Sequence, residues 1–334
     1  MKILVTDYAW RDLEIERNLF APLSAQLVAA KTGEEDELFD LAADADGILT
    51  NWKRVSRKVI ANAPKCQAIV RYGVGLDNID VQFATQVGII VANVPYYCIE
   101  EVSDHTLALL FSLARKIAHY DRGIKSGIYD LASGTPMYRL RGKTLGLLGF
   151  GSMAKMVCRK AQALGLKVIV CRRSKSSADL GDGVRQVDFN ELLRESDFVS
   201  LHVPLVPETR RLFNREVFLQ MKKTAFLINT ARGDVIDAQA LLHALEEGQI
   251  AGAALDVFSK EPPDLPDPLL SHPKTIVTPH AAFNSEESLE ELRKTASEQM
   301  LAVLRGGVPE YFVNREVAVS PNLRARCQST GAIR

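Results

Sequence analysis

Short apolar runs alternate with longer polar-faced segments along the first hundred residues, and each run has the length of a strand. The segments between them, such as Glu34–Ala43 and Arg57–Ala63, have the pattern of helices with one polar face. Alternating strands and helices indicate a parallel sheet with helices on both faces. The predicted strands are Ile3–Thr6, Gly47–Thr50, Ala68–Arg71 and Ile89–Ala92.

A longer apolar segment follows, from Glu100 to about Lys125. It is too long for a strand, and it is apolar around most of its circumference. A helix of this kind is buried on several sides. We therefore expect one long helix that lies between domains or in a subunit interface.

A second series of strands and helices begins after the loop at Ser133–Pro136, and it predicts a second doubly wound parallel sheet. The chain is thus expected to be an α/β protein. The tail beyond Val317 lacks apolar periodicity, which predicts a poorly ordered extension. The predicted strands are Thr144–Leu148, Lys167–Cys171, Phe198–Leu201, Ala225–Asn229, Ala251–Leu255 and Thr275–Val277, and the predicted helices are Ser152–Leu164, Phe189–Glu195 and Ala238–Glu247.

Length and composition add limits to this picture. A chain of 334 residues suits two domains better than one. With 41 basic and 41 acidic residues, the formal net charge is zero, so no bulk attraction to nucleic acid or to anionic membranes is indicated. No apolar run reaches the roughly 20 residues that span a bilayer. The five cysteines are scattered without a CxxC pair, which suggests neither disulfides nor a metal site, and we expect a cytoplasmic, soluble protein.

The turn after the first strand of the second series carries the residues Gly149-Phe-Gly-Ser-Met-Ala154. Gly149 permits a tight turn, and Gly151 lets the backbone approach a pyrophosphate at the start of the next helix. The third position of the pattern is Ala154, which helix–strand packing tolerates. Because this turn joins a strand to a helix, it predicts a dinucleotide-binding loop.

The end of the following strand bears on the choice of cofactor. An acidic residue there would bind the ribose 2′-hydroxyl of NAD, but the sequence continues with Arg172, Arg173, Ser174 and Lys175 and reaches no carboxylate before Asp179. A guanidinium bonded to a 2′-phosphate contributes about 1.5–3 kcal/mol, or about 10–100-fold in affinity. We therefore expect a preference for NADP(H), with NAD possible; a solvated basic loop is the alternative.

Three side chains after strands of the second series meet the needs of 2-keto acid reduction. Arg232 offers a bidentate anchor for a carboxylate, and His280 offers a proton for the ketone oxygen. Glu261 would hold the imidazole in one tautomer and favour its acid form. Since ligands bind at the carboxyl ends of parallel strands, we expect the three to converge on one site.

With these motifs in order, the sequence resembles the family of D-isomer-specific 2-hydroxyacid dehydrogenases from about residue 40 to residue 315. The resemblance is carried by Tyr72–Asp80, Glu101–Thr106, the Gly149 loop, His202–Pro204, Asn229–Gly233, Ala254–Val257 and Thr278–His280.

The resemblance implies a flavodoxin-like substrate domain formed by residues 1–100 and 284–334, and a Rossmann dinucleotide-binding domain formed by residues 101–283. It implies that Arg232, Glu261 and His280 are the substrate arginine, the supporting acid and the proton donor, and that the amides of Val74 and Gly75 hold the substrate carboxylate. It also implies a homodimer through the cofactor domain. The residues assigned to the cofactor are Thr106, Gly149, Gly151, Ser152, Met153, Arg172, Arg173, His202, Val203, Pro204, Thr209, Thr230, Ala231, Asp256 and Ala282, with Asp256 near the nicotinamide carboxamide.

Two segments, Asn93–Thr106 and Thr278–Glu286, are most similar to the branch of C-terminal-binding proteins. Phe283 stands where that branch usually has a tryptophan, and it is expected to form an aromatic wall for the substrate. Asn51 and its neighbours Trp52 and Lys53 are expected to shape the far side of the pocket. A place for Trp52 in the hydrophobic core is the alternative.

Two other functions fit the same sequence. The branch includes cofactor-sensing corepressors, so a binding protein of that kind is one alternative. A dehydrogenase of another small anion, such as formate or phosphite, is the second. The remaining histidines, which are His105, His119, His243 and His272, are given structural roles.

Overall fold

The computed structural model describes residues 1–173 and 180–325, which divide into two compact units. The first unit takes Met1–Tyr97 and the chain from Ser285 onward, and the second takes Cys98–Asn284. Ser174, Lys175 and Asp179, which were used to predict the cofactor, lie outside the described residues. The last nine residues of the tail, which include Cys327, also lie outside them.

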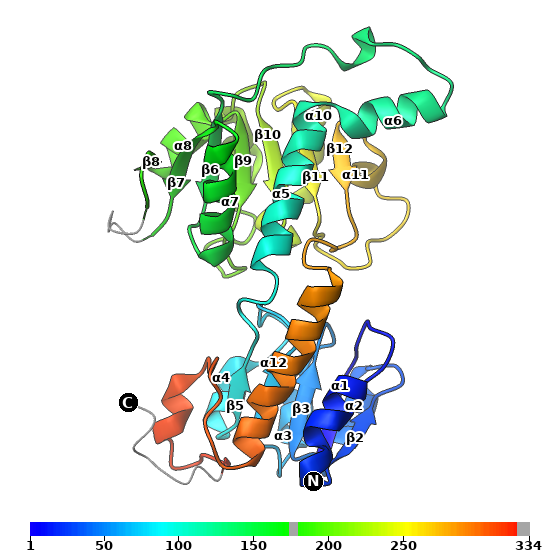
Figure 1. Ribbon diagram of the computed structural model, residues 1–334, viewed down its shortest axis with the longest axis vertical. Coiled ribbons are helices and arrows are strands. Elements are labelled where there is room, and N and C mark those ends of the chain that lie inside the picture. Colours follow the sequence, from blue (N-terminus) through cyan, green and yellow to red (C-terminus); the bar gives the residue numbers. More distant parts are fainter. Residues whose placement is uncertain (174–179, 326–334) are drawn as a thin grey trace. The chain divides into compact units, whose positions relative to one another are not determined.

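The first unit is built on a five-stranded parallel sheet with the strand order β2-β1-β3-β4-β5 (Figure 1). This is the order of flavodoxin-like folds. Its strands are β1 (Lys2–Val5), β2 (Gln26–Ala29), β3 (Gly47–Thr50), β4 (Ala68–Arg71) and β5 (Ile90–Ala92). Its helices are α1 (Glu14–Phe20), α2 (Glu35–Ala42), α3 (Arg57–Ala61), α4 (Val81–Gln86) and α12 (Glu286–Leu304), with short 3-10 turns η1 (Ala21–Leu23) and η4 (Arg315–Val319).

Strand β2 and helix α12 are among the elements of the first unit that the sequence analysis did not predict. Strand β2 lies at the edge of the sheet, and none of its residues is fully buried, so its apolar pattern is weak. Helix α12 begins with a capping box, in which Ser285 and Ser288 accept each other's backbone N–H. Its apolar side packs on β3, β4 and α1.

The prediction of a poorly ordered tail is wrong for residues 318–325. The Arg324 amide donates to Gly88 O at 2.9 Å, and its guanidinium donates to Ala63 O at 2.7 Å. A Cβ on Gly88 would lie 1.8 Å from Asn322 O, so the tail is packed directly on the backbone. These contacts depend on hydrogen bonds and on a glycine, and therefore leave no apolar periodicity in the sequence.

The second unit is built on a seven-stranded parallel sheet with the order β12-β11-β10-β9-β6-β7-β8. The predicted pair of doubly wound parallel sheets is thus confirmed. Its strands are β6 (Thr144–Leu148), β7 (Lys167–Cys171), β8 (Val184–Gln186), β9 (Phe198–Leu201), β10 (Phe226–Asn229), β11 (Gly252–Leu255) and β12 (Thr275–Val277). Its helices are α5 (Ile99–Ala114), α6 (Ile117–Lys125), α7 (Ser152–Ala163), α8 (Phe189–Glu195), α9 (Arg215–Gln220), α10 (Ala238–Glu246) and α11 (Pro268–Ser271), with 3-10 turns η2 (Ala132–Gly134) and η3 (Gly233–Val235).

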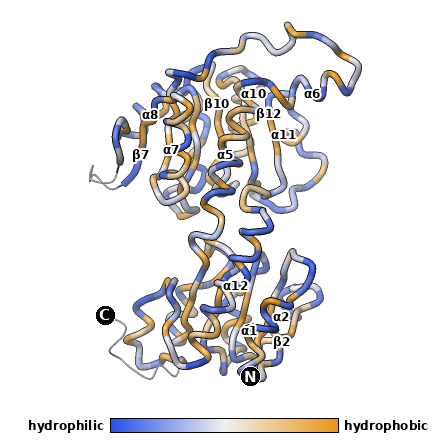
Figure 2. The backbone as a smooth tube through the Cα atoms, in the orientation of Figure 1, coloured by the Kyte–Doolittle hydropathy of each residue, from blue (hydrophilic) through white to orange (hydrophobic). Residues whose placement is uncertain are grey.

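Neighbouring residues of the central strands belong to different hydrophobic cores on the two faces of this sheet. Leu145 and Leu147 of β6 face a core shared with α5 and α7, whereas Leu148 faces the core that α8, α9 and α10 cover. Both faces are therefore apolar, and the strands read as continuous hydrophobic runs (Figure 2).

The prediction of one long helix over residues 100–125 is wrong. The chain turns at Lys116, whose φ of 56° is left-handed, and α5 and α6 are separate helices. Helix α5 is buried along much of its length, as expected, but α6 has no buried residue. The Lys116 ammonium lies 5.2 Å from the ring centroid of Phe226, a cation–π contact that accompanies the turn.

A buried ion pair joins α12 to α1 in the first unit. Glu16 is fully buried, and the Arg293 guanidinium donates to its two carboxylate oxygens at 3.1 and 2.9 Å. The Tyr72 hydroxyl lies 3.4 Å from the same carboxylate. Each group depends on its partner, because an unpaired buried charge is costly.

We expect Arg293→Ala to lower the free energy of unfolding by about 3–5 kcal/mol, because it leaves the Glu16 carboxylate without its counter-charge. Equilibrium urea unfolding measures the change. Lys294→Ala is the matched control, since its pair with Glu290 lies on the surface, where ion pairs contribute little to stability. Equal effects of the two variants would contradict the prediction.

Candidate active site

The three residues predicted to be catalytic follow three strands that are neighbours in the second sheet. Arg232 follows β10, Glu261 follows β11 and His280 follows β12, and the sheet order places β11 between the other two. Since the strands are parallel, all three loops leave the same edge of the sheet. The parallel order thus gathers residues that lie 48 positions apart in the sequence.

His280 and Glu261 are joined directly. Their atoms Nδ1 and Oε2 lie 2.6 Å apart, and the other Glu261 oxygen accepts the amide N–H of Phe258 at 2.9 Å. Burial alone would raise the pKa of Glu261. It is nevertheless lowered below its ordinary value, because the hydrogen bond and charge of His280, the Phe258 amide and the charge of Arg232 outweigh burial. Glu261 is therefore a carboxylate that accepts a hydrogen from His280 Nδ1.

Arg232 is held by its own strand end. Its Nη1 donates to Ala231 O at 2.7 Å, and its carbonyl accepts the side-chain amide of Asn229 at 2.9 Å. The next residue, Gly233, packs on the Phe258–Ser259 backbone so closely that a Cβ would lie 2.0 Å from Phe258 C. This contact fixes the arginine loop against the loop that carries Glu261.

The turn that carries His280 is organised by Asp256, a fully buried carboxylate after β11. It accepts the backbone N–H groups of Ala281 and Ala282 at 2.8 and 3.0 Å and the hydroxyl of Thr278 at 2.6 Å. Sequence reasoning assigned Asp256 to the nicotinamide carboxamide and missed its bonds within the protein, because no local pattern shows which amides a carboxylate will meet.

The glycine loop after β6 has the geometry that a pyrophosphate requires. Gly149 has a φ of 92°, and a Cβ there would lie 2.3 Å from His202 O. A Cβ on Gly151 would meet nothing within 4 Å, so open space lies at the N-cap of α7. The first-turn amides of a helix, here from Ser152 and Met153 onward, have no acceptor within the helix and attract phosphate. These residues fit a dinucleotide.

The arginines after β7 lie beside this loop. Arg172 Nε donates to the side chain of Gln186 at 3.4 Å, and its guanidinium lies 5.7 Å from the ring centroid of Phe150. Arg173 is exposed, and its guanidinium lies 3.5 Å from the Glu208 carboxylate. Arg172 is thus close to the dinucleotide loop, whereas Arg173 extends toward solvent.

The other residues assigned to the cofactor lie along the same edge of the second sheet. Burial lowers the pKa of His202 to about 4, so this imidazole is neutral and shares a hydrogen bond with Ser200 at 2.9 Å. Thr209 closes the loop after His202-Val203-Pro204 by donating to Pro204 O at 2.6 Å. The hydroxyls of Thr106 and Thr230 are 3.1 Å apart, which ties α5 to the end of β10.

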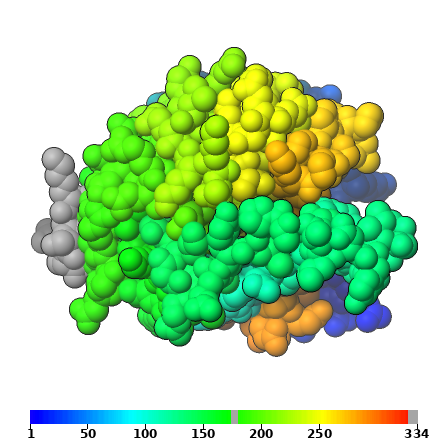
Figure 3. Space-filling view, turned by 90° about the horizontal axis from the view of Figure 1, so that it is seen from above, coloured from blue at the N-terminus to red at the C-terminus, as the bar shows by residue number. Residues whose placement is uncertain are grey.

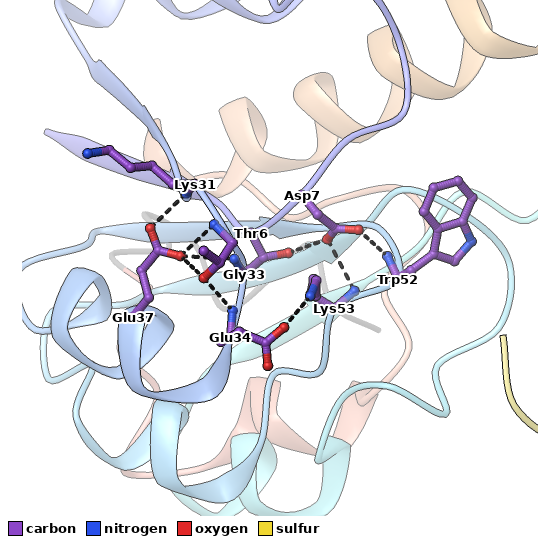
Figure 4. Close-up of polar contacts among 9 residues, drawn as sticks. Thr6, Asp7, Lys31, Gly33, Glu34, Glu37, Trp52 and Lys53 are labelled. Carbon is purple, nitrogen blue, oxygen red and sulfur yellow. Dashed lines mark hydrogen bonds and ion pairs between the residues drawn. The ribbon is translucent and has the colours of Figure 1, made fainter. Parts of the chain in front are cut away.

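In the first unit, Asp7 organises the loop that contains Asn51. Its carboxylate accepts the backbone N–H groups of Asn51, Trp52 and Lys53 at 3.1, 2.8 and 3.2 Å. Figure 4 shows this carboxylate facing the loop while the Trp52 indole points away from it. Trp52 is 45% exposed, so its alternative assignment to the core is wrong.

The loop with Val74 and Gly75 is tied to the Asn51 loop by Arg71. This buried guanidinium donates to Asn51 O at 3.1 Å and to Gly75 O at 2.8 Å. Gly73 has a φ of 141°, and a Cβ there would lie 2.7 Å from Arg71 Nη1, so a residue with a side chain would be strained at this position. In the second unit, Phe283 meets the His280 ring edge-on, with the ring centroids 6.1 Å apart.

Neither a group of metal ligands nor a membrane-spanning helix is found among the described residues. Among residues 1–173 and 180–325, no group of three or more His, Cys, Asp or Glu side chains is placed to hold a metal ion. The helices in these ranges are all too short or too polar to cross a bilayer.

Comparison with known proteins shows which family the chain belongs to. Residues 107–282, more than half of the chain, match the model of the family "D-isomer specific 2-hydroxyacid dehydrogenase, NAD binding domain". A glyoxylate reductase of Korarchaeum cryptofilum is 39% identical over 303 residues, which cover 89% of this chain and 88% of that protein.

Two solved structures are similar over 94% of this chain. One is D-lactate dehydrogenase from Aquifex aeolicus complexed with NAD and lactic acid, with a TM-score of 0.86 and 27% identity over 99% of that chain. The other is an acyclic imino acid reductase in complex with NADPH and D-Arg, with a TM-score of 0.85 and 28% identity over all of that chain. The narrower resemblance to the C-terminal-binding-protein branch stays a prediction. On the strength of its sheets, its dinucleotide loop and these relatives, the chain belongs to the family of D-isomer-specific 2-hydroxyacid dehydrogenases.

Proposed function

We propose that this protein reduces small 2-keto acids of the glyoxylate class to the corresponding 2-hydroxy acids, with Arg232, Glu261 and His280 as its catalytic residues. The observation that carries the proposal is the 2.6 Å contact between His280 Nδ1 and Glu261 Oε2 beside the charge of Arg232. The similarity to glyoxylate reductases supports the substrate class.

His280 is the proton donor in this proposal. Because Glu261 is ionised, it accepts the hydrogen on Nδ1 and leaves Nε2 to carry the proton that moves to the ketone oxygen. The negative charge of Glu261 stabilises the imidazolium before transfer. In the oxidation of a 2-hydroxy acid, neutral Nε2 accepts the proton instead.

Arg232 binds the substrate carboxylate and polarises the ketone, since a guanidinium matches a carboxylate with two parallel hydrogen bonds. The amides of Val74 and Gly75 are assigned to the same carboxylate, in a loop that Arg71 and Gly73 hold in shape. Asn51 and Phe283 are assigned to the substrate side chain.

A nicotinamide dinucleotide, when bound, supplies the hydride that is added to C2. Gly149, Gly151 and the first turn of α7 would hold its pyrophosphate. We further propose that NADP(H) is preferred, because Arg172 lies beside this loop and a guanidinium pairs well with a 2′-phosphate.

A homodimer through the second unit is the proposed assembly. Helix α6 and the loop after it run across one end of this unit (Figure 1) and form a continuous surface ridge (Figure 3). Apolar side chains exposed on a ridge of this kind indicate a protein–protein interface. The exposed apolar residues are Ile117, Ile124, Ile128, Tyr129, Leu131 and Tyr138.

We also propose a cytoplasmic location, because the cysteines are scattered along the sequence without a CxxC pair and suggest no disulfide framework.

We expect His280→Gln to lower kcat for glyoxylate reduction by about 10²–10⁴-fold, because the proton donor is lost. On the acid side, wild-type kcat/KM should fall only below the ordinary carboxyl range, since the lowered pKa of Glu261 keeps that group ionised. Steady-state rates across the acid pH range test this expectation. His272→Gln, in a loop before β12, is the control, and an unchanged rate for His280→Gln would refute the mechanism.

We expect Arg172→Asp to reverse the cofactor preference by lowering the NADPH/NADH ratio of kcat/KM at least about tenfold, because a carboxylate repels the 2′-phosphate. Initial rates with each cofactor at fixed glyoxylate give the ratio. Arg159→Asp, on the exposed side of the second half of α7, should leave the ratio unchanged. The NADP(H) preference is wrong if Arg172→Asp behaves like this control.

We expect the double variant Ile124→Glu and Leu131→Glu to be monomeric at micromolar concentration, since it places charges in the proposed interface. Light scattering after gel filtration measures the mass. Leu219→Glu, a similarly exposed position on α9, should remain dimeric. A monomeric wild-type protein, or a dimeric double variant, would rule out this interface.

A further inference from the structure

We infer that His105, on helix α5, is a positioning residue for His280, acting through Thr278 and Asp256. The inference rests on the proposed role of His280 as the proton donor. The histidine and the threonine are 173 positions apart in the sequence, and the fold places His105 Nε2 3.0 Å from Thr278 Oγ1. Sequence analysis gave His105 only a structural role.

The backbone at His280 needs such support. Its φ of 53° is left-handed, a conformation that residues other than glycine rarely adopt. The His280 amide donates to Asp256 O at 2.8 Å, and the next two amides donate to the Asp256 carboxylate. The orientation of Asp256 therefore determines the position of the turn and the direction of the imidazole that follows from it.

The hydrogen bonds of Thr278 determine that Nε2 of His105 carries a hydrogen. The hydroxyl has one hydrogen, and this hydrogen is donated to Asp256 Oδ1 at 2.6 Å. In its contact with His105, the hydroxyl oxygen must then accept, so His105 Nε2 carries a hydrogen. The same Nε2 lies 3.5 Å from Asp256 Oδ1. The chain of donors thus runs from His105 to Thr278 and on to the Asp256 carboxylate.

Asp256 is fully buried, so its charge must be balanced by donors within the protein. Its partners are the hydroxyl of Thr278, the amides of Ala281 and Ala282, and the imidazole of His105. The first three belong to the segment that carries His280, whereas His105 comes from a separate helix and ties that segment to α5.

Loss of the Nε2 donor would leave Thr278 Oγ1 with an unsatisfied lone pair and weaken the hold on Asp256 Oδ1. The backbone at His280 would then relax from its left-handed conformation, and His280 Nδ1 would lose its alignment with Glu261. Small misplacements of a catalytic group reduce turnover more than they reduce ligand binding. The expected signature is a fall in kcat with little change in cofactor affinity.

The experiment compares His105→Leu, which removes the donor, with His105→Gln, whose amide nitrogen can reach the place of Nε2. Two readouts are taken on the full-length protein. The first is kcat for glyoxylate reduction, with the cofactor Kd from fluorescence titration and the melting temperature as controls. The second is the low-field proton resonance of the hydrogen between His280 Nδ1 and Glu261, assigned by its absence in His280→Gln.

We expect His105→Leu to lower kcat about 10–100-fold and to broaden or remove the low-field resonance, with the cofactor Kd changed less than about threefold. His105→Gln should keep the resonance and recover kcat to within about threefold of wild type. Thr278→Val should match His105→Leu, and the double variant should be no worse than either single variant, because the residues act in one chain.

Retention of both the resonance and kcat in His105→Leu would overturn the inference, as would equal losses in His105→Leu and His105→Gln. If the wild type reduces no 2-keto acid while the resonance still responds as described, the positioning role stands and the proposed function fails. The two hypotheses are thus separated by the same set of variants.

Discussion

The parallel order of β10, β11 and β12 is the constraint on which the candidate active site of the second unit depends. Parallel strands end at one edge, so the loops after these three neighbours must emerge side by side. The edge thereby receives an arginine, two carboxylates and a histidine from distant parts of the sequence. Close packing between loops then sets their spacing, as the contact of Gly233 with the Phe258–Ser259 backbone shows.

Carboxylates that accept backbone N–H groups hold the loops at both sheet edges. Asp256 binds the turn of His280 in the second unit, and Asp7 binds the loop of Asn51 in the first. Glu37 does the same for residues 31–33, and its hydrogen bonds with the Thr32 hydroxyl and with these amides lower its pKa to about 2 (Figure 4). A short, ionised side chain that satisfies two or three amides fixes a loop without regular structure, because unpaired backbone donors are costly when buried.

The proposed catalytic pair His280–Glu261 differs from Asp256 in its exposure. Both side chains are about one-third exposed, whereas Asp256 is fully buried. A partly exposed imidazole can exchange its proton with solvent between turnovers, while a buried carboxylate behind it keeps the turn in place. The exchangeable proton and the fixed support thus belong to different residues, which follow the neighbouring strands β12 and β11.

The sequence by itself determined the two parallel sheets, the glycine loop and the three catalytic candidates, because strand length, glycine spacing and the position of polar residues after strands are local properties. It failed where the outcome depended on distant partners. The break at Lys116, the packed tail at Asn322 and the edge strand β2 left no periodic signal. Only the tertiary structure decided that His105, Thr278 and Asp256 form one hydrogen-bond chain, since a donor and an acceptor 173 positions apart meet only when helix and sheet have packed.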